Sequence, residues 1–268
     1  MSHPDSKEPQ HGHPHAPPAA NPGHPGGHGP GAEPAPLDLN EKGAAIDGVR
    51  QSLDKRLFVQ LVVFECGAGT APDATARTLA AGLKEAGIGG IVYEDVSDPR
   101  GLGVATWAVD PADFVTKARP VFNQPALALR PRPSMTMLGR TYSTGFEQDL
   151  EFWMLRRPVE TLQNPALKWG IWYPLRRTGA FARLDPREQG AILREHGMIG
   201  KAYGDADHAH DVRLACHGLD TNDNEFVIGL IGKELYPLSH VVQAMRKTRQ
   251  TSEFIQHMGP FFVGRVVA

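Results

Sequence analysis

A histidine in the second half of the chain has the setting of either a metal ligand or a packed core residue. In ILREHG, His196 follows Ile192 by four positions and Leu193 by three, and such positions share a face when a segment is helical. This spacing places the imidazole on the buried side. A buried imidazole needs a partner for each ring nitrogen, which can be a backbone carbonyl, a carboxylate, a water or a metal. From these residues alone a core histidine is favoured, because ligand histidines are the rarer use.

The first 36 residues are rich in histidine, proline and glycine and show no apolar period. Such a segment cannot bury enough surface to offset its ordering entropy, so we predict a disordered tail. Its histidines are His3, His11, His13, His15, His24 and His28. Imidazole suits zinc, copper and nickel, so the tail could capture a metal, but the irregular spacing favours a plain soluble extension.

Composition argues against several classes of protein. The net charge is −2 and the basic residues are dispersed, which gives no footprint for nucleic acid. The chain shows neither a secretory signal nor an apolar run approaching the roughly 20 residues of a membrane span, so we expect a cytoplasmic protein. Cys66 and Cys216 form no CxxC motif and have small or apolar neighbours. They predict two reduced, packed thiols, with a disulfide as the alternative.

Hydrophobic periodicity predicts the same order of elements twice. The first set is a strand at 56–65, a helix at 71–90, strands at 91–97 and 103–109, and a helix at 110–122. The second set is a strand at 168–177, a helix at 184–197, strands at 212–220 and 224–232, and a helix at 237–248. Asp73 and Asp185 are the expected N-caps, and Pro111 and Pro186 suit the first turns of their helices.

This repeat predicts an α+β fold made of two ferredoxin-like halves. The antiparallel sheets would carry helices on their outer faces and cover each other by packing into a dimeric α+β barrel. The expected divisions are a tail at 1–36, a first half at 50–150 and a second half at 151–268.

Within this layout, four stretches together resemble the chlorite dismutase family of haem proteins, which includes the coproheme decarboxylases. They are WYPLRR at 172–177, EHGMIGKAY at 195–203, HGLDTNDNEFVIGLIG at 217–232, and VVQAMRKTRQTSEFIQHMGPFFVGR at 241–265. The closing GPFFVGR is the most family-like piece. The resemblance is strong over about residues 170–265 and looser over 57–130, and it implies that the second half carries the haem site.

The resemblance changes the interpretation of His196. In this family the histidine of the motif similar to EHG is the axial ligand of the haem iron, which implies that role for His196. An apolar wall that includes Ile192 and Leu193 would then hold the porphyrin and exclude water. Tyr173 matches the radical-forming tyrosine of the decarboxylases. The alternative is that Tyr173 packs at a strand end with Trp169 and Trp172, with its hydroxyl at the surface.

Two further residues match positions that contact propionates in the decarboxylases. Arg177 stands where the family has a lysine, on the same strand face as Tyr173, and a guanidinium keeps the charge but changes its geometry. Thr251 matches a family serine.

The distal position, opposite the axial ligand, departs from the family pattern. Chlorite dismutases carry an arginine there and many decarboxylases a glutamine, whereas the matching count leads to Ala209. Arg213 is the nearby arginine, and His208 and His210 are also candidates. An arginine over the iron would steer and hold an anion such as chlorite. The alternative is that Arg213 forms a surface salt bridge of little energetic value.

Three functions therefore stay open. The favoured one is peroxide-dependent decarboxylation of iron coproporphyrin III through Tyr173, as in haem b biosynthesis. The second is an enzyme with permanent haem b that acts on chlorite or peroxide under the control of Arg213. The third is a haem carrier without turnover, with a metal-binding tail. The resemblance also implies a homopentamer or another ring oligomer.

Overall fold

The protein is described by a computed structural model that covers residues 36–267. The tail histidines from His3 to His28, and the expectation that they bind metal, fall outside the described residues. Contacts divide the chain into Met1–Asp38 and Leu39–Ala268, and the helices and strands below belong to the second unit. No helix in the described part of this unit is long and apolar enough to cross a membrane.

Both halves of the predicted repeat are present. The first contains β3 (Phe58–Cys66), α1 (Pro72–Glu85), β4 (Gly89–Asp95), β5 (Gly101–Ala108), α2 (Arg119–Phe122) and β7 (Met137–Arg140). The second contains β8 (Trp169–Arg177), α5 (Pro186–Asp205), β9 (His210–Ala215), β10 (Phe226–Gly232), α6 (Leu235–Met245) and β12 (Phe262–Val266). Further elements are β1 (Glu41–Ile46), β2 (Val49–Leu53), β6 (Leu129–Pro131), α3 (Arg157–Gln163), α4 (Gly179–Ala182) and β11 (Ile255–Met258).

The strands of the two halves stand in equivalent order. The first half is ordered β7–β3–β5–β4 and the second β12–β8–β10–β9, with antiparallel pairing throughout. Strand β4 pairs with β12, and β7 meets β9 where Arg140 lies opposite Ala215, so the pairings form a closed circuit. The expectation of an α+β fold with ferredoxin-like antiparallel sheets is confirmed.

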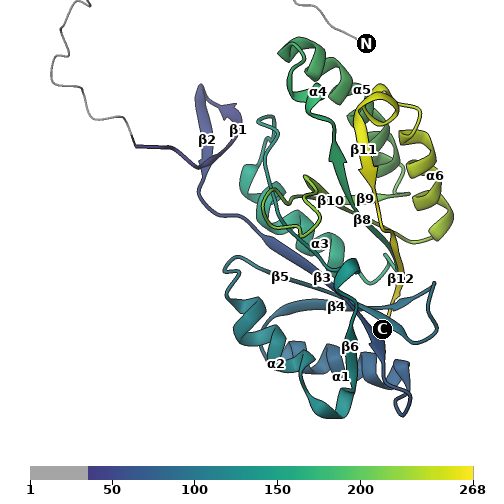
Figure 1. The fold of residues 1–268 in the computed structure, drawn as a ribbon. Coiled ribbons are helices and arrows are strands. Elements are labelled where there is room, and N and C mark those ends of the chain that lie inside the picture. Colours follow the sequence, from purple (N-terminus) through teal and green to yellow (C-terminus); the bar gives the residue numbers. More distant parts are fainter. Residues whose placement is uncertain (1–35, 268) are drawn as a thin grey trace, which may run out of the picture. The chain divides into compact units, whose positions relative to one another are not determined.

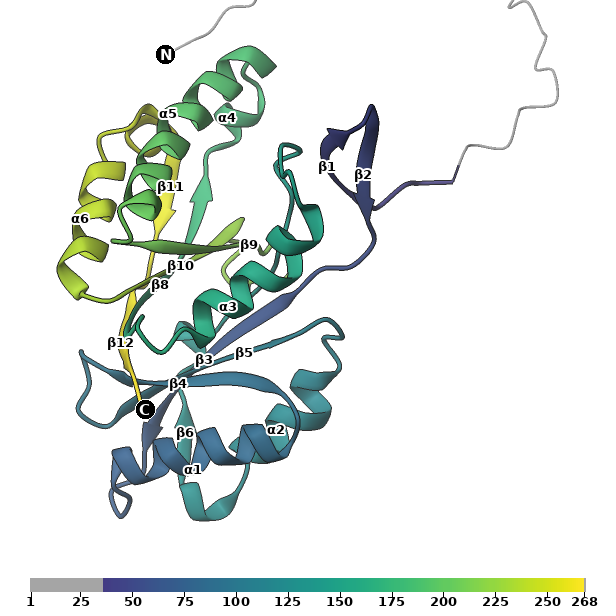
Figure 2. The ribbon, with the colours of Figure 1, turned by 180° about the vertical axis from the view of Figure 1, so that it is seen from behind.

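Side-chain alternation divides the core into an inside and an outside of this circuit. On β3, Val59, Leu61 and Val63 pack with residues of both halves inside it, whereas Phe64 and Cys66 pack outside it with α1 and α2. Figures 1 and 2 show α1 and α2 beside the first half and α5 and α6 beside the second. Both cysteines are buried and free, as predicted.

Two expected helix starts were wrong. Helix α1 has Ala71 as its N-cap, without a side-chain cap bond, and Asp73 instead bonds Arg77 at 3.1 Å. Pro72 takes the first helical position, which suits its missing N–H, and this moves the start ahead of Asp73. Pro111 lies in a turn before the second helix, which opens with a π-helical turn at Phe114–Ala118. Pro120 has no N–H to donate to the carbonyl four residues before it, and the turn that precedes it is the wider, π-helical one.

The hairpin of β1 and β2 and the segment 129–163 were not predicted. Gln51 on β2 ties the hairpin to the later segment, because its amide donates to the Glu147 carbonyl at 2.8 Å and accepts from the Leu150 N–H at 3.0 Å. The hairpin is therefore anchored by polar bonds to the loop at 141–150.

Candidate functional site

Helix α5 carries His196 on its inner stripe. The helix begins as predicted, with Pro186 first and the Asp185 carboxylate accepting from the Arg187 N–H at 2.8 Å. Ile192, His196, Ile199 and Tyr203 follow at positions that share one helix face. Ile192 is buried and the other three are half-buried. His196 thus lies on the inner side, as the sequence predicted.

The inner face of α5 is covered far less than that of its counterpart in the first half. Helix α1 buries four residues on its sheet, Thr75, Ala76, Leu79 and Leu83. Helix α5 is longer, yet Ile192 is its one buried residue. Leu193, expected in an apolar wall with Ile192, is 44% exposed, because it points away from the stripe. The second half therefore leaves a helix face that its own side chains do not fill.

The outer face of the second sheet presents three aligned residues on the same side as α5 and α6. Tyr173 on β8 lies opposite Ile228 on β10, and Ile228 lies opposite Arg213 on β9. Directly opposed residues project from the same face of a sheet, so the three form one row. With strands about 4.8 Å apart, the Cα atoms of Tyr173 and Arg213 are separated by roughly 10 Å.

Tyr173 is held rigidly in an apolar setting. It is 6% exposed, and its ring stacks on that of Phe261 with centroids 4.7 Å apart. Burial raises its pKa above the ordinary value, while the charge of Arg246 acts in the opposite direction. Its hydroxyl has no hydrogen-bond partner among residues 36–267. The packing partner is not Trp172, which points into the circuit of strands.

His196 is biased towards a neutral ring with one free nitrogen. Burial, and then the charge of Arg213, lower its pKa. Nδ1 lies 3.5 Å from Oγ1 of Thr248, whose hydroxyl donates to the Met245 carbonyl at 2.8 Å. Thr248 can therefore accept from Nδ1–H, which leaves the lone pair on Nε2. Nε2 has no partner within the described part of the chain.

Arg213 is oriented by a half-buried network of three charged side chains rather than by a simple surface pair. Its Nε lies 2.8 Å from one carboxylate oxygen of Asp211, and Arg157 binds the other at 2.7 Å. Burial opposes the charge of Asp211, but Arg213 and Arg157 outweigh it and keep the pKa of that carboxyl below its usual range. The guanidinium thus stays on the face that carries Tyr173, with 38% of its side chain exposed.

The other distal candidates lie elsewhere. Ala209 is buried in the cluster with Leu238, and His208 is exposed after the end of α5. His210 is occupied by Asp207, with Nε2 and the carboxylate 2.7 Å apart. Of the four candidates, the structure brings Arg213 together with His196 and Tyr173.

The two residues matched to propionate contacts are already engaged. Arg177 pairs through Nε with Glu225 at 3.2 Å, and its guanidinium lies over the rings of Phe181 and Phe226 at 4.5 and 4.7 Å. The Oγ1 of Thr251 lies 3.3 Å from that of Thr248, one contact behind His196. Arg177 is a fixed cation at the edge of the face, and Thr251 belongs to the hydroxyl group behind the imidazole.

The loop at 141–150 borders the same face. The ring of Tyr142 lies 5.6 Å from that of Phe226, and burial raises its pKa, while the nearby charges of Arg213 and Asp211 act in opposite directions. Glu147 folds the loop by accepting from the Thr144 and Gly145 N–H groups at 2.8 and 3.0 Å. These bonds and the Ser143 hydroxyl outweigh burial and lower the pKa of Glu147 to about 2.

Sequence reasoning missed four participants: Thr248, Asp211, Arg246 and Tyr142. Thr248 meets His196 from 52 positions away, and Arg157 meets Asp211 from 54. No short motif marks such pairs. Arg246 lies in the motif at 241–265 that resembles the family. It forms no ion pair with a carboxylate among the described residues.

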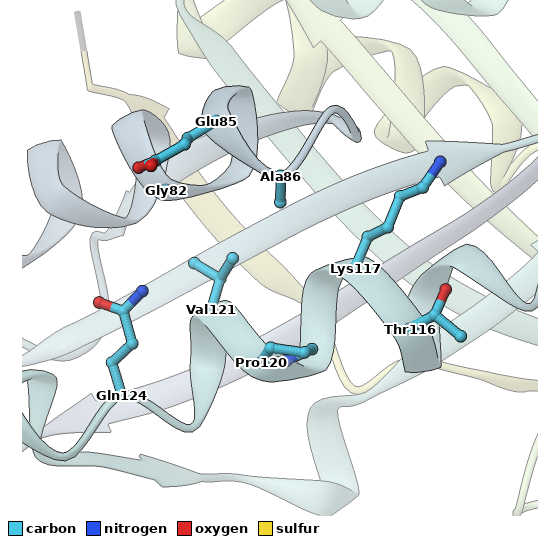
Figure 3. Close-up of a pocket in the computed structure, with 8 residues that line it drawn as sticks. All are labelled: Gly82, Glu85, Ala86, Thr116, Lys117, Pro120, Val121 and Gln124. Atoms are coloured by element: carbon cyan, nitrogen blue, oxygen red, sulfur yellow. The ribbon is translucent and has the colours of Figure 1, made fainter.

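A separate groove of about 380 Å³ lies between α1 and α2 in the first half. Figure 3 shows Ala86 and Val121 at its centre, with Lys117 at one end. Lys117 is neutralised by Asp113 at 2.9 Å. None of the candidate site residues contributes to this groove, so it is distinct from the face under α5.

The chain was then compared with known proteins. The sequence model of the family described as chlorite dismutase matches residues 104–267. No curated protein matches the sequence.

Solved structures share the fold at low identity. A protein described as a chlorite dismutase is 16% identical with a TM-score of 0.64, covering 80% of this chain and 95% of its own. A haem-binding protein from Thermus thermophilus is 18% identical with a TM-score of 0.62, covering 79% and 91%. Chlorite dismutase from Candidatus Nitrospira defluvii, in complex with imidazole, is 15% identical with a TM-score of 0.60, covering 78% and 90%.

Proposed function

Because the chain belongs to the chlorite dismutase family, we propose that it is a haem-dependent oxidoreductase whose substrate is iron coproporphyrin III. It would use peroxide to remove two propionate carboxyls and so form haem b. One feature supports porphyrin binding above all others. Helix α5 turns a face that is only partly covered, and that carries His196, towards a sheet face that carries Tyr173 and Arg213.

The residues present suit an iron porphyrin. A neutral imidazole with a free Nε2 is a good iron ligand when its other nitrogen donates a hydrogen bond, here to Thr248. Apolar side chains of Ile199 and Ile228 offer contacts for a flat macrocycle. Arg246 is a cation beside Tyr173 that could take a carboxylate, with Arg177 as a second.

A bound iron porphyrin would supply the redox chemistry with peroxide as the oxidant. Tyr173 is suited to lose a proton and an electron together, because its buried surroundings disfavour the phenolate. Its hydroxyl, without a hydrogen-bond partner among the described residues, is available to a bound propionate. Stacking on Phe261 holds the Tyr173 ring in place during this loss of a proton and an electron.

A second candidate is favoured by Arg213. A guanidinium on the face opposite His196 could hold chlorite or a peroxide anion, as expected of an enzyme with permanent haem b. Asp211 and Arg157 fix the direction of that charge. In this second function Tyr173 only lines the site, and Arg213 is the residue that acts on the anion.

The two candidates differ in their products. The full-length protein is loaded with iron coproporphyrin III without oxygen and titrated with peroxide, and porphyrins are followed by mass spectrometry. We expect stepwise loss of two carboxyls, abolished in Tyr173→Phe. Tyr93→Phe is the matched control, because Tyr93 is a buried tyrosine inside the circuit of strands and should leave the products unchanged.

Binding without loss of carboxyls would contradict the decarboxylase. Haem b is then loaded, and turnover of chlorite is compared between the natural chain and Arg213→Ala. A loss of turnover in that variant would support the second candidate. Equal product formation by Tyr173→Phe would remove Tyr173 from the chemistry altogether.

A further inference from the structure

The inner stripe of α5 leads from His196 to a second tyrosine. Tyr203 follows His196 by seven positions, which are two helical turns and about 10 Å along the axis. It is half-buried and packs against the apolar cluster that contains Tyr173. Tyr203 therefore lies at the end of the face assigned above to the porphyrin.

Unlike Tyr173, Tyr203 has a base in contact with its hydroxyl. The phenol is hydrogen-bonded to Nδ1 of His240 on α6, and the two rings are 5.9 Å apart. Tyr236 stands one turn before His240 on α6, with its ring 5.7 Å from the imidazole, and is 74% exposed. The three rings form a path from the apolar cluster to the surface.

A phenol with a hydrogen-bonded base is the easier one to oxidise. Loss of an electron makes the phenolic proton strongly acidic, so oxidation is fast only where a base lies within hydrogen-bond reach. Before a porphyrin propionate is bound, neither Tyr173 nor Tyr142 has such a base among the described residues, since no hydrogen bond joins either hydroxyl to them. The Tyr203 hydroxyl differs from both, because it is hydrogen-bonded to an imidazole nitrogen.

We infer that Tyr203 and His240 form a proton-coupled redox pair that passes oxidising equivalents from the site under α5 to the surface through Tyr236. The inference rests on the proposed function for its oxidant, a hydroperoxide acting at that site. One electron leaves the Tyr203 ring for the oxidant at the site under α5, and its phenolic proton moves to Nδ1 of His240, which gives a neutral phenoxyl radical and an imidazolium.

The pair can also return to its starting state with electrons and protons balanced. Tyr236 gives one electron to the Tyr203 radical, which takes back its proton from His240, and the proton of exposed Tyr236 goes to water. A small one-electron donor, such as a phenol or an enediol, then reduces Tyr236 by transfer of one electron and one proton. The path would let the protein discharge surplus oxidation without damage near Tyr173.

The test uses the full-length protein without porphyrin, so that it does not depend on the proposed function. A ruthenium polypyridyl photo-oxidant with persulfate generates the oxidation, and tyrosyl radicals are followed by electron paramagnetic resonance. All variants carry Tyr236→Phe, because Tyr236 is exposed and would otherwise be oxidised directly or take the radical from Tyr203. In this background we expect the main tyrosyl radical to vanish in Tyr203→Phe and to form about a hundredfold more slowly in His240→Phe. His240→Gln should be equally slow, because an amide keeps the hydrogen bond but is no base. Tyr142→Phe should match the Tyr236→Phe background.

An unchanged radical in Tyr203→Phe, or an unchanged rate in both His240 variants, would overturn the inference. In protein loaded with iron coproporphyrin III, peroxide should produce the Tyr203 radical in the Tyr173→Phe background. Its absence there, with porphyrin bound and peroxide consumed, would also overturn the relay. Failure of the proposed function is distinguishable, since it would show as no porphyrin binding while the light-driven radical persists.

Discussion

At the scale of single residues, the imidazole of His196 is set by groups far away in sequence. Thr248 faces Nδ1, and burial together with the charge of Arg213 lowers the pKa of the ring, which favours its neutral form. These influences together leave Nε2 as the nitrogen with the free lone pair, because a ring held at Nδ1–H must carry its lone pair on Nε2. The chemistry of the site is therefore distributed over α5, β9 and the segment after α6.

Thr248→Val should weaken porphyrin binding. The change keeps the shape but removes the acceptor for Nδ1–H, and loss of such a supporting bond typically lowers metal affinity by about 10-fold to 100-fold. Titration followed by visible spectroscopy measures this, and Thr248→Ser should restore the affinity. Thr106→Val is the matched control, because Thr106 is a buried threonine in the first half. Equal weakening in both would mean that the effect is not specific to His196.

The pKa of His196 should respond in opposite directions to two changes on β9. The positive charge of Arg213 lowers this pKa and the negative charge of Asp211 raises it. Arg213→Ala should therefore raise it and Asp211→Asn should lower it. Nuclear magnetic resonance titration of the ring protons in porphyrin-free protein measures both. Shifts of the same sign, or none, would mean that β9 does not face His196.

At the scale of elements, α5 and α1 hold equivalent places in the repeat but are packed differently. Helix α1 buries four residues and α5 only Ile192. A helix with few buried contacts opens locally more often. Hydrogen exchange should therefore be faster in α5 than in α1 without porphyrin, and porphyrin should slow it in α5 alone. Equal protection of both helices before loading would contradict an uncovered face.

The loop at 141–150 depends on an ionised carboxylate. The pKa of Glu147 is about 2 in the folded chain against an ordinary 4.5. Its stabilising effect is complete above pH 4.5 and is lost as the pH falls through 2. The difference corresponds to about 3 kcal/mol. In Glu147→Gln, denaturant unfolding should show lower stability at neutral pH and a smaller loss between pH 4.5 and 3. An identical acid profile would contradict this role.

The elements themselves were largely predictable, and their ends were less so. Runs of mostly apolar residues marked β3 and β8 because both faces of each strand pack against a core, and Asp185 with Pro186 marked the start of α5. Asp73 failed as a cap because Pro72 suits the first helical position, a choice that the two neighbouring signals leave open.

At the scale of the whole described unit, the two halves share one fold but differ in how their helices cover the sheets. Helices α1 and α2 cover the outer face of the first sheet, whereas α5 beside the second sheet buries only Ile192. The repeat was visible in the sequence because both halves need the same buried faces. The distal side was not visible in the sequence. The position of Arg213 depends on strand register and on Arg157, and no local sequence pattern indicates either of them. The ring oligomer stays a prediction.

The most direct test of the central claim is a visible titration of the full-length protein with iron coproporphyrin III under anaerobic conditions. The natural chain and His210→Ala should bind one equivalent with the same spectrum, because His210 is occupied by Asp207. His196→Ala should lose the spectrum of an imidazole-bound iron and most of the affinity. Undiminished binding with an unchanged spectrum in His196→Ala would show that the face under α5 does not hold the iron.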